Sequence, residues 1–405
     1  MEQQTFHLMK FGESMSKKNS HYIQMDFIIL LVLFIGVSLL AIYNAQQLEQ
    51  YGGTNFVLQQ AIFFVVGILI LAAIQFIDLE QLYKSSIVIY IFGVLLLVIL
   101  HFSPPSIAKE INNAKSWFTG IPGFSLQPSE LTKIAFIIFL AAIISKHKEK
   151  YQESTIKSDL YLLFKIIFAS IIPIIFIFEQ PDLGTSLVFA FIAGVLIILS
   201  GINWKIIAVF IVSITTLVSG ILLIVLYFPE LAQHVLGIKP YQIDRVITWF
   251  DPTQQTGDDR FQIDRSLLAV GSGQLMGKGM SSLEVYLPEA HTDFIFSVIG
   301  ESFGFIGGAA VILLNFLLMY KLVTLGLKSY KFSVFGSFLC FGFMSLLLIH
   351  AFQNIGMTIG IMPITGIPLL LISYGGSSVI STMIGYAIVY RVAVEGSRQD
   401  DYLFK

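Results

Sequence analysis

The chain has 405 residues, of which 56% are hydrophobic and 12% are charged, and its formal net charge is −2 at pH 7. Soluble globular domains carry about 25% charged residues, so this composition excludes a water-soluble domain and indicates a polytopic membrane protein. The near-neutral charge gives no electrostatic basis for binding nucleic acid. The single cysteine, Cys340, cannot form an intramolecular disulfide.

Apolar runs that are long enough to cross a bilayer recur along the chain. A hydrocarbon core of about 30 Å takes about 20 apolar residues in a helix. By this measure we predict ten transmembrane helices, at residues 26–44, 57–77, 86–103, 128–146, 160–179, 183–201, 205–228, 294–320, 334–357 and 368–391. The predicted fold class is therefore an all-α polytopic membrane protein.

The basic residues predict how the chain is oriented. Most of the 24 Lys and Arg residues fall in inner segments if the N-terminus is cytoplasmic. An even number of helices then makes both termini cytoplasmic. The division that follows is a cytoplasmic tail at 1–25, helices 1–7 within 26–228 with an outer loop at 104–127, a large extracellular loop at 229–293, helices 8–10 within 294–391 and a cytoplasmic tail at 392–405.

The large extracellular loop is longer than most connections that lack a function. It contains an amphipathic stretch at 241–250, which could lie at the membrane interface, and a second helix-like stretch at 261–270. It ends with Glu289, His291 and Asp293, directly before the eighth apolar run. We predict that Glu289 and His291 bind substrate or line a cavity beside Asp293. An acid at a membrane boundary indicates a functional site, although capping of the following helix explains Asp293 equally well.

Ionisable residues also precede or begin two earlier apolar runs. Glu130 and Lys133 are three residues apart and so share a helix face. They indicate either a local ion pair at a helix entrance or a cation placed in a cavity for a phosphate. Asp182 is either a helix N-cap or a polar residue at the same membrane level as Glu130. Trp117, in the outer loop, is an interfacial anchor or a stacking platform for a sugar or a partner.

Polar residues in the last two apolar runs favour a packing role. His350, Gln353 and Asn354 share one helix face, which is typical of side chains that join helices in a membrane. Two glycine-rich stretches, 271–279 and 373–378, lack the strand and the residue spacing of phosphate-binding loops.

Several motifs together resemble those of the RodA/FtsW (SEDS) family over most of the chain. They are Leu126-Gln-Pro-Ser-Glu-Leu-Thr-Lys133, Gln180-Pro-Asp-Leu-Gly-Thr185, Gly271-Ser-Gly-Gln-Leu-Met-Gly-Lys-Gly279, Tyr286-Leu-Pro-Glu-Ala-His-Thr-Asp293, Gln353-Asn-Ile-Gly-Met-Thr-Ile-Gly360 and Ser373-Tyr-Gly-Gly-Ser-Ser378. The stretches Ala114-Lys-Ser-Trp-Phe118 and Ser397-Arg-Gln-Asp-Asp-Tyr-Leu-Phe404 are more similar to the RodA branch, which acts in cell elongation, than to FtsW.

The resemblance implies a peptidoglycan glycosyltransferase that polymerises lipid II at the outer face of the plasma membrane, with a role in cell shape. It implies that Asp293 is the essential acid, that Glu130, Lys133 and Asp182 belong to a cavity, and that Trp117 belongs to the outer loop. It further implies a class B penicillin-binding protein transpeptidase as partner. A divalent cation, Mg²⁺ or Mn²⁺, is implied without known ligands.

The chemistry of this reaction agrees with the residues available. A base must take a proton from the acceptor hydroxyl, and we predict that Asp293 is this base. The leaving group is already a diphosphate, so it needs cations rather than the paired acid of a glycosidase. The candidate cations are a metal, Lys133 and one of three arginines of the large loop: Arg245, Arg260 or Arg265.

Two other classes of function stay open at this point. A lipid II flippase would use the intramembrane charges as a path for the polar headgroup. A non-catalytic scaffold for a transpeptidase would use Asp293 only as a helix cap.

Overall fold

The computed structural model describes residues 23–48, 50, 53–110, 114–121, 124–153, 155–238, 243, 247 and 258–403. Most of the predicted amphipathic stretch at 241–250, including Arg245, lies outside the described residues, as does the N-terminal tail up to residue 22.

The described part of the chain is built from membrane-length helices. Nine are long and apolar enough to span a membrane, and a shorter apolar helix of 17 residues, α7, joins them. In chain order they are α2 (Met25–Ala45), α3 (Phe56–Ile74), α4 (Leu79–Phe102), α5 (Pro128–Lys150), α6 (Ile156–Glu179), α7 (Leu183–Leu199), α8 (Trp204–Tyr227), α12 (Ile295–Ser329), α13 (Val334–Thr358) and α14 (Gly376–Leu403). The predicted all-α polytopic fold is confirmed.

Side-chain caps in the sequence account for where several helices begin. The first backbone N–H groups of a helix have no partner within it, and a polar side chain at the N-cap supplies one. Asn55 accepts a hydrogen bond from the N–H of Leu58 at the start of α3, and Ser333 accepts one from Gly336 in α13. Pro128 occupies the first position of α5, where its missing N–H is not needed.

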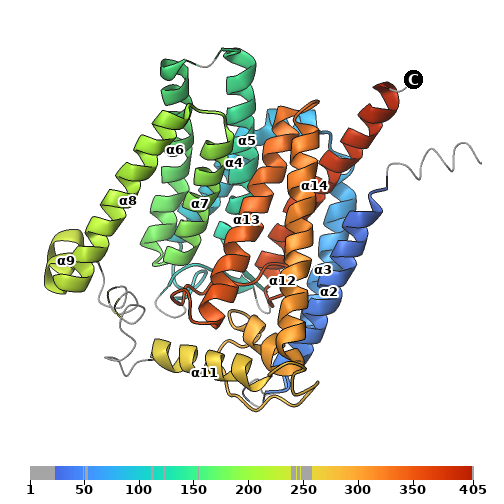
Figure 1. The fold of residues 1–405 in the computed structure, drawn as a ribbon, viewed down its shortest axis with the longest axis vertical. Coiled ribbons are helices and arrows are strands. Elements are labelled where there is room, and N and C mark those ends of the chain that lie inside the picture. Colours follow the sequence, from blue (N-terminus) through green and yellow to red (C-terminus); the bar gives the residue numbers. More distant parts are fainter. Residues whose placement is uncertain are drawn as a thin grey trace, which may run out of the picture.

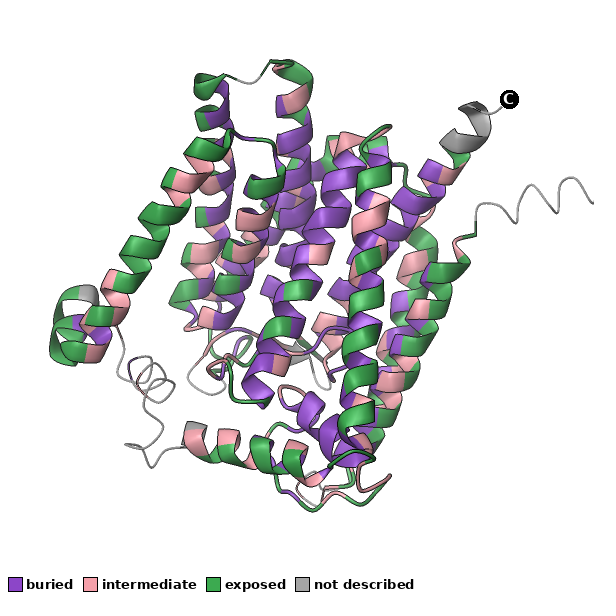
Figure 2. Cartoon of the chain, viewed as in Figure 1, coloured by how far each residue is buried: buried purple, intermediate pink, exposed green. Residues whose placement is uncertain are grey.

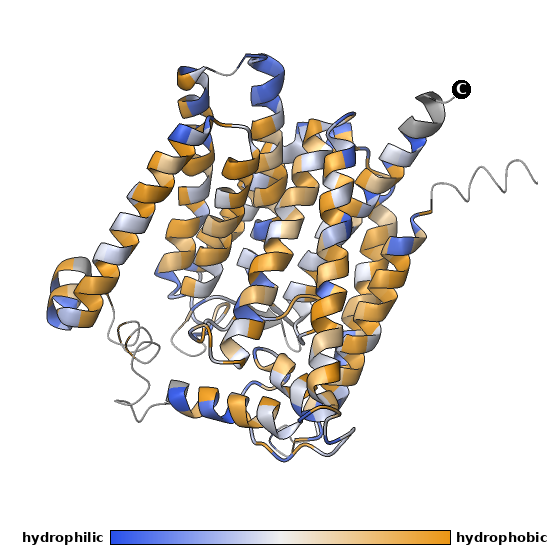
Figure 3. Cartoon of the chain, in the orientation of Figure 1, coloured by the Kyte–Doolittle hydropathy of each residue, from blue (hydrophilic) through white to orange (hydrophobic). Residues whose placement is uncertain are grey.

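Three helices, α5, α13 and α14, form the centre of the bundle (Figures 1 and 2). In their apolar portions, 83% of the residues of α5 and α13 and 89% of those of α14 are buried. In α8 the buried share is 6%, and Figure 1 shows this helix leaning away from the bundle toward α9 (Pro229–Leu236). Figure 3 shows that α8 is hydrophobic along most of its length, which suits a helix that faces lipid.

One end of the bundle carries the shorter elements. The strands β1 (Phe118–Ile121) and β2 (Phe124–Leu126) form an antiparallel hairpin before α5. The helix α11 (Asp258–Ser272) lies across this end (Figure 1). It includes the stretch at 261–270 that was predicted to be helical. Its buried Ser266 hydroxyl contacts the Ser297 hydroxyl at 2.7 Å and donates to the Thr358 carbonyl at 2.7 Å. One hydroxyl thus joins α11 to both α12 and α13.

The eighth predicted helix differs from the expectation of one unbroken run at 294–320. Gly304 has φ 63° and ψ −158°, and this breaks α12 into a short first part and a long second part. The break frees the N–H groups that follow it, and carbonyls of the glycine-rich stretch accept them: Phe305 donates to Gln274 at 2.8 Å and Ile306 to Leu275 at 3.2 Å. Asp293 therefore precedes a short half-helix rather than the long span.

Close backbone contact explains two of the glycines at 271–279, Gly273 and Gly277. A Cβ on Gly273 would lie 1.9 Å from the Gly300 carbonyl oxygen, and a Cβ on Gly277 would lie 2.2 Å from that of Ser302. The stretch is also fixed electrostatically, because the buried carboxylate of Glu301 accepts hydrogen bonds from the Lys278 ammonium at 2.7 Å and from the Glu284 N–H at 3.0 Å.

The last predicted helix, at 368–391, begins later in the structure, at residue 376. Residues 359–375 form an irregular connection in which Gly360, Gly366 and Leu371 have positive φ. This backbone cannot continue a right-handed helix, and it brings residues 365–368 close to Asp293 and to the start of α7.

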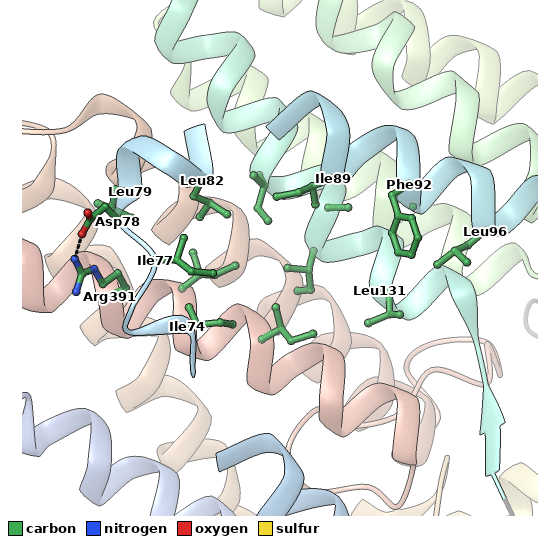
Figure 4. Close-up of a pocket in the computed structure, with 16 residues that line it drawn as sticks. Ile74, Ile77, Asp78, Leu79, Leu82, Ile89, Phe92, Leu96, Leu131 and Arg391 are labelled. Carbon is green, nitrogen blue, oxygen red and sulfur yellow. Dashed lines mark hydrogen bonds and ion pairs between the residues drawn. The ribbon is translucent and has the colours of Figure 1, made fainter. Parts of the chain in front are cut away.

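An apolar cavity of about 340 Å³ lies between α4, α5 and α14 (Figure 4). Its walls are mostly branched aliphatic side chains, and the ion pair of Asp78 and Arg391 lies at one end. None of the predicted site residues lines this cavity.

The glycine contacts generate a prediction about stability. Replacing Gly273 by Ala should lower the free energy of unfolding by about 1–3 kcal/mol, because the added methyl overlaps a backbone carbonyl that cannot rotate away. Gly271→Ala is the matched control, since a Cβ there meets nothing within 4 Å. Thermal unfolding in detergent measures both, and equal melting temperatures for the two variants would contradict the proposed contact.

Candidate functional site

The backbone before α12 is held by the C-terminal third of the chain. Three consecutive carbonyls each accept one hydrogen bond from this region. The bonds run from the Tyr374 N–H to His291 at 2.9 Å, from the Ser373 hydroxyl to Thr292 at 2.7 Å and from the Asn354 amide to Asp293 at 2.7 Å. The partly exposed Asp293 therefore extends from a fixed backbone. The N-cap position of α12 is Phe294, one residue later.

Residues 365–368, which we call the 365–368 segment, lie against Asp293. The Asn354 amide that binds the Asp293 carbonyl also donates to the Ile367 carbonyl at 2.9 Å. Gly366 has φ +66°, and a Cβ there would lie 3.5 Å from the Asp293 carboxylate. On its other side the segment meets α7, since a Cβ on Gly184 would lie 2.6 Å from the Thr365 carbonyl oxygen.

Glu130 and Lys133 form an ion pair at the centre of the bundle. Lys133 Nζ lies 2.8 Å from Glu130 Oε1, and the two residues are only 1% and 3% exposed. The pair is not isolated, because Lys133 Nζ also lies 3.1 Å from His350 Nε2, and the Ser381 hydroxyl donates to Glu130 Oε2 at 3.3 Å. Side chains of α5, α13 and α14 thus meet at one buried charge pair.

Asp182 is the N-cap of α7 and also faces the hairpin end of α5. Its Oδ1 accepts a hydrogen bond from the backbone N–H of Thr185 at 2.9 Å, and its Oδ2 accepts one from the side-chain amide of Gln127 at 3.4 Å. Burial raises the pKa of the Asp182 carboxyl, and the hydrogen bonds from Thr185 act against this shift. The Gln127 N–H in turn donates to the Ser377 hydroxyl at 3.0 Å, which joins the start of α5 to the start of α14.

The other two ionisable residues near Asp293 have different surroundings. Glu289 is exposed, has φ 50°, and accepts a hydrogen bond from the Thr292 hydroxyl at 3.2 Å. His291 is buried against two aromatic rings, with centroid distances of 4.4 Å to Phe56 and 5.3 Å to Tyr374. Burial lowers the pKa of His291, which favours a neutral, packed side chain.

Trp117 lies in the connection between α4 and α5, directly before β1, and is half-buried. The nearby Lys115 ties this connection to the end of α4, because its ammonium donates to the carbonyls of His101 and Ser103. Trp117 thus begins a short, anchored hairpin rather than a long open loop.

The described residues do not include a cluster of metal-binding side chains. Among them, no three His, Cys, Asp or Glu side chains gather in a way that could hold a metal ion. The Mg²⁺ or Mn²⁺ implied by the sequence resemblance stays a prediction, and we assign no chemical step to it.

Three residues of the site were not predicted from the sequence. Asn354 and His350 were interpreted as helix-joining side chains, and Ser373 as part of a glycine-rich stretch, whereas each contacts backbone at the site. The available signal was a polar side chain within an apolar run. A polar side chain in an apolar run does not reveal which group it binds. Here the bound groups are backbone carbonyls far away in the sequence.

Comparison with known proteins gives consistent relatives. A family model for FtsW, RodA and SpoVE, a cell cycle protein family, matches residues 21–398. The probable peptidoglycan glycosyltransferase FtsW of Nitrosomonas europaea is 32% identical over 396 residues, which cover 94% of this chain and 96% of the relative. The stage V sporulation protein E of Bacillus subtilis is 31% identical over 387 residues, with 93% and 98% covered.

Solved structures share the fold. A chain from a peptidoglycan synthase complex, studied for its coordination of polymerization and crosslinking, superimposes with a TM-score of 0.73 at 24% identity and covers 91% of this chain and 97% of its own. The rod shape determining protein RodA of Thermus thermophilus superimposes with a TM-score of 0.62 at 24% identity, with 91% and 95% covered.

The buried ion pair generates a second prediction. Lys133→Met should lower the free energy of unfolding by about 3–5 kcal/mol, because it leaves the Glu130 carboxylate buried without its cation. The double variant Glu130→Gln/Lys133→Met should be markedly more stable than Lys133→Met, since it removes both charges. Unfolding of the wild type, Glu130→Gln, Lys133→Met and the double variant in detergent completes the cycle, and strictly additive effects would contradict a coupled pair.

Proposed function

We propose a function from the premise that the chain belongs to the FtsW, RodA and SpoVE family, whose model matches residues 21–398. The chain is a multi-pass membrane enzyme, a peptidoglycan glycosyltransferase that polymerises lipid II into glycan strands. The proposal is supported by relatives named as probable peptidoglycan glycosyltransferases that are 31–32% identical over at least 83% of this chain.

The observation that carries the proposal is the arrangement around Asp293. Its backbone is held by Asn354, and its neighbours by Ser373 and Tyr374. A base needs a fixed position relative to the proton that it takes, because misplacement lowers the rate of proton transfer. A carboxylate on a rigid backbone at the end of the bundle meets this requirement.

The reaction follows from the groups present. Asp293 takes the proton of an acceptor sugar hydroxyl as the oxygen of that hydroxyl bonds to the anomeric carbon of the donor. The bond from this carbon to the diphosphate oxygen breaks, and the lipid diphosphate leaves with the bonding electrons. The charge of Lys133 suits the diphosphate, and the 365–368 segment connects the surroundings of Lys133 with those of Asp293.

The end of the bundle that carries Asp293 is proposed to face the outside of the plasma membrane. The opposite ends of α5 and α12 carry most of the basic residues of these two helices: Lys146, Lys148, Lys150 and Lys328. Basic residues gather on the cytoplasmic side of membrane proteins, so their position supports an extracellular active site and cytoplasmic termini.

A class B penicillin-binding protein transpeptidase is the proposed partner. The similarity to a chain from a complex that couples polymerization with crosslinking supports it. A role in elongation rather than division rests on the residues around Trp117 and on the C-terminal stretch, whereas the two relatives named above from the sequence comparison are an FtsW and a stage V sporulation protein E. Loss of rod shape on depletion in the host would support elongation, and filamentation would contradict it.

The function generates a third prediction. Asp293→Asn should lower polymerisation by about 10²–10⁴-fold, the usual contribution of a positioned base, while leaving the melting temperature unchanged. The measurement is the yield of glycan strands from purified protein, with and without its partner, supplied with lipid II in detergent. Glu230→Gln is the matched control, because this acid is exposed on α9 and has no predicted role in the site, so its activity should stay close to that of the wild type.

The same assay separates the proposed function from its alternatives. Detergent offers no membrane to cross, so a pure flippase makes no strands there, and neither does a scaffold. Near-normal strand synthesis by Asp293→Asn would contradict the role of Asp293 alone. No strands from the wild type would contradict the glycosyltransferase itself.

A further inference from the structure

One buried histidine of α13, His350, contacts both Lys133 and the 365–368 segment that lies against Asp293. His350 is 1% exposed. Its Nε2 lies 3.1 Å from Lys133 Nζ, and its Nδ1 lies 2.9 Å from the Pro368 carbonyl oxygen. Both ring nitrogens are therefore within hydrogen-bond distance of a partner, and the two partners belong to different parts of the chain.

The two contacts define a single protonation state of the ring. A carbonyl oxygen only accepts hydrogen bonds, so the contact with Pro368 requires a proton on Nδ1. An ammonium only donates, so the contact with Lys133 requires a lone pair on Nε2. The neutral Nδ1–H tautomer satisfies both contacts at once, and no other form of the ring does.

This tautomer gives Lys133 a second, uncharged partner from another helix. A lysine ammonium is a point charge on a flexible four-carbon stem, so one contact does not fix its position. Glu130 holds the ammonium from α5 and His350 holds it from α13. An ammonium has three donors, so these two bonds leave one of them for a further acceptor.

The second contact of the ring connects Lys133 with the surroundings of Asp293. Pro368 ends the 365–368 segment, and the preceding residue, Ile367, shares the Asn354 amide with Asp293. His350 and Asn354 are four residues apart and so lie on one face of α13. Side chains on this face therefore contact both the Lys133 ammonium and the backbone of Asp293.

We propose that His350 is a positioning residue of the glycosyltransferase, which holds the Lys133 ammonium and the Pro368 carbonyl at a fixed separation. In this way it sets the cation for the diphosphate at a defined place relative to the Asp293 base. The inference rests on the proposed function, and it assigns no contact with substrate to His350 itself.

Three substitutions separate the two contacts. His350→Gln places an amide oxygen about where Nε2 lies, so it keeps an acceptor for Lys133 and loses the bond to Pro368. His350→Asn places an amide N–H about where Nδ1 lies, so it keeps the donor to Pro368 and loses Lys133. His350→Leu removes both contacts while filling the same space.

The measurement is kcat and KM for lipid II polymerisation in detergent, together with the melting temperature of each variant. His350→Leu should lower kcat by at least about tenfold with a smaller change in KM, because misplaced charges weaken the transition state more than substrate binding. His350→Gln and His350→Asn should each fall between His350→Leu and the wild type, since each keeps one of the two bonds.

His147→Leu is the matched control for a purely structural effect. His147 is also a buried histidine, 5% exposed, but it lies in the last turn of α5, at the opposite end of that helix from Lys133. This substitution should lower the melting temperature without changing the kcat of the folded protein.

The outcomes distinguish the inference from the function on which it rests. If the wild type makes strands and His350→Leu keeps kcat within about twofold of it, the inference is overturned and the proposed function stands. If the wild type makes no strands, both are overturned. If Gln and Asn variants both match the Leu variant, the separate roles of the two ring nitrogens are wrong.

Discussion

The buried ion pair of Glu130 and Lys133 is the interaction on which the rest of the bundle depends. Moving two charges out of water costs several kcal/mol for each ion, and their attraction compensates only if further hydrogen bonds satisfy the remaining polar atoms. His350 and Ser381 supply such bonds from two other helices. The pair therefore requires α5, α13 and α14 to meet, and these are the helices that are most buried.

Irregular backbone near the end of the bundle is possible for a related reason. Within a membrane protein, non-helical backbone is tolerated only where the protein or water supplies hydrogen-bond partners. His350 and Asn354 supply them to the 365–368 segment, and Ser373 supplies one to the backbone beside Asp293. The side chains that satisfy this backbone thus also place Asp293 near the segment, so the stability of the fold and the proposed catalytic geometry use the same contacts.

The sequence was sufficient for features that depend on local pattern. Hydrophobic length predicted the membrane helices, and their boundaries placed Glu130, Lys133 and Asp182 near one membrane level. The break at Gly304 could not be predicted, because it depends on carbonyls of Gln274 and Leu275 that only the folded chain brings there. Burial of individual polar side chains was equally hidden, since an apolar run does not reveal which of its faces meets another helix.

The glycines at 273 and 277 bear on how the family's sequences are interpreted. At these positions two backbones touch with no room for a side chain, and Gly277 also has a φ of +78°, which disfavours other residues. A growth-based scan of all substitutions would mark them as intolerant by the same readout as the proposed catalytic acid at 293, although they take no part in bond making. Intolerance in such a scan therefore reports two separate demands on this protein, one for space and one for chemistry, and only an assay of the folded protein's turnover assigns a residue to the second.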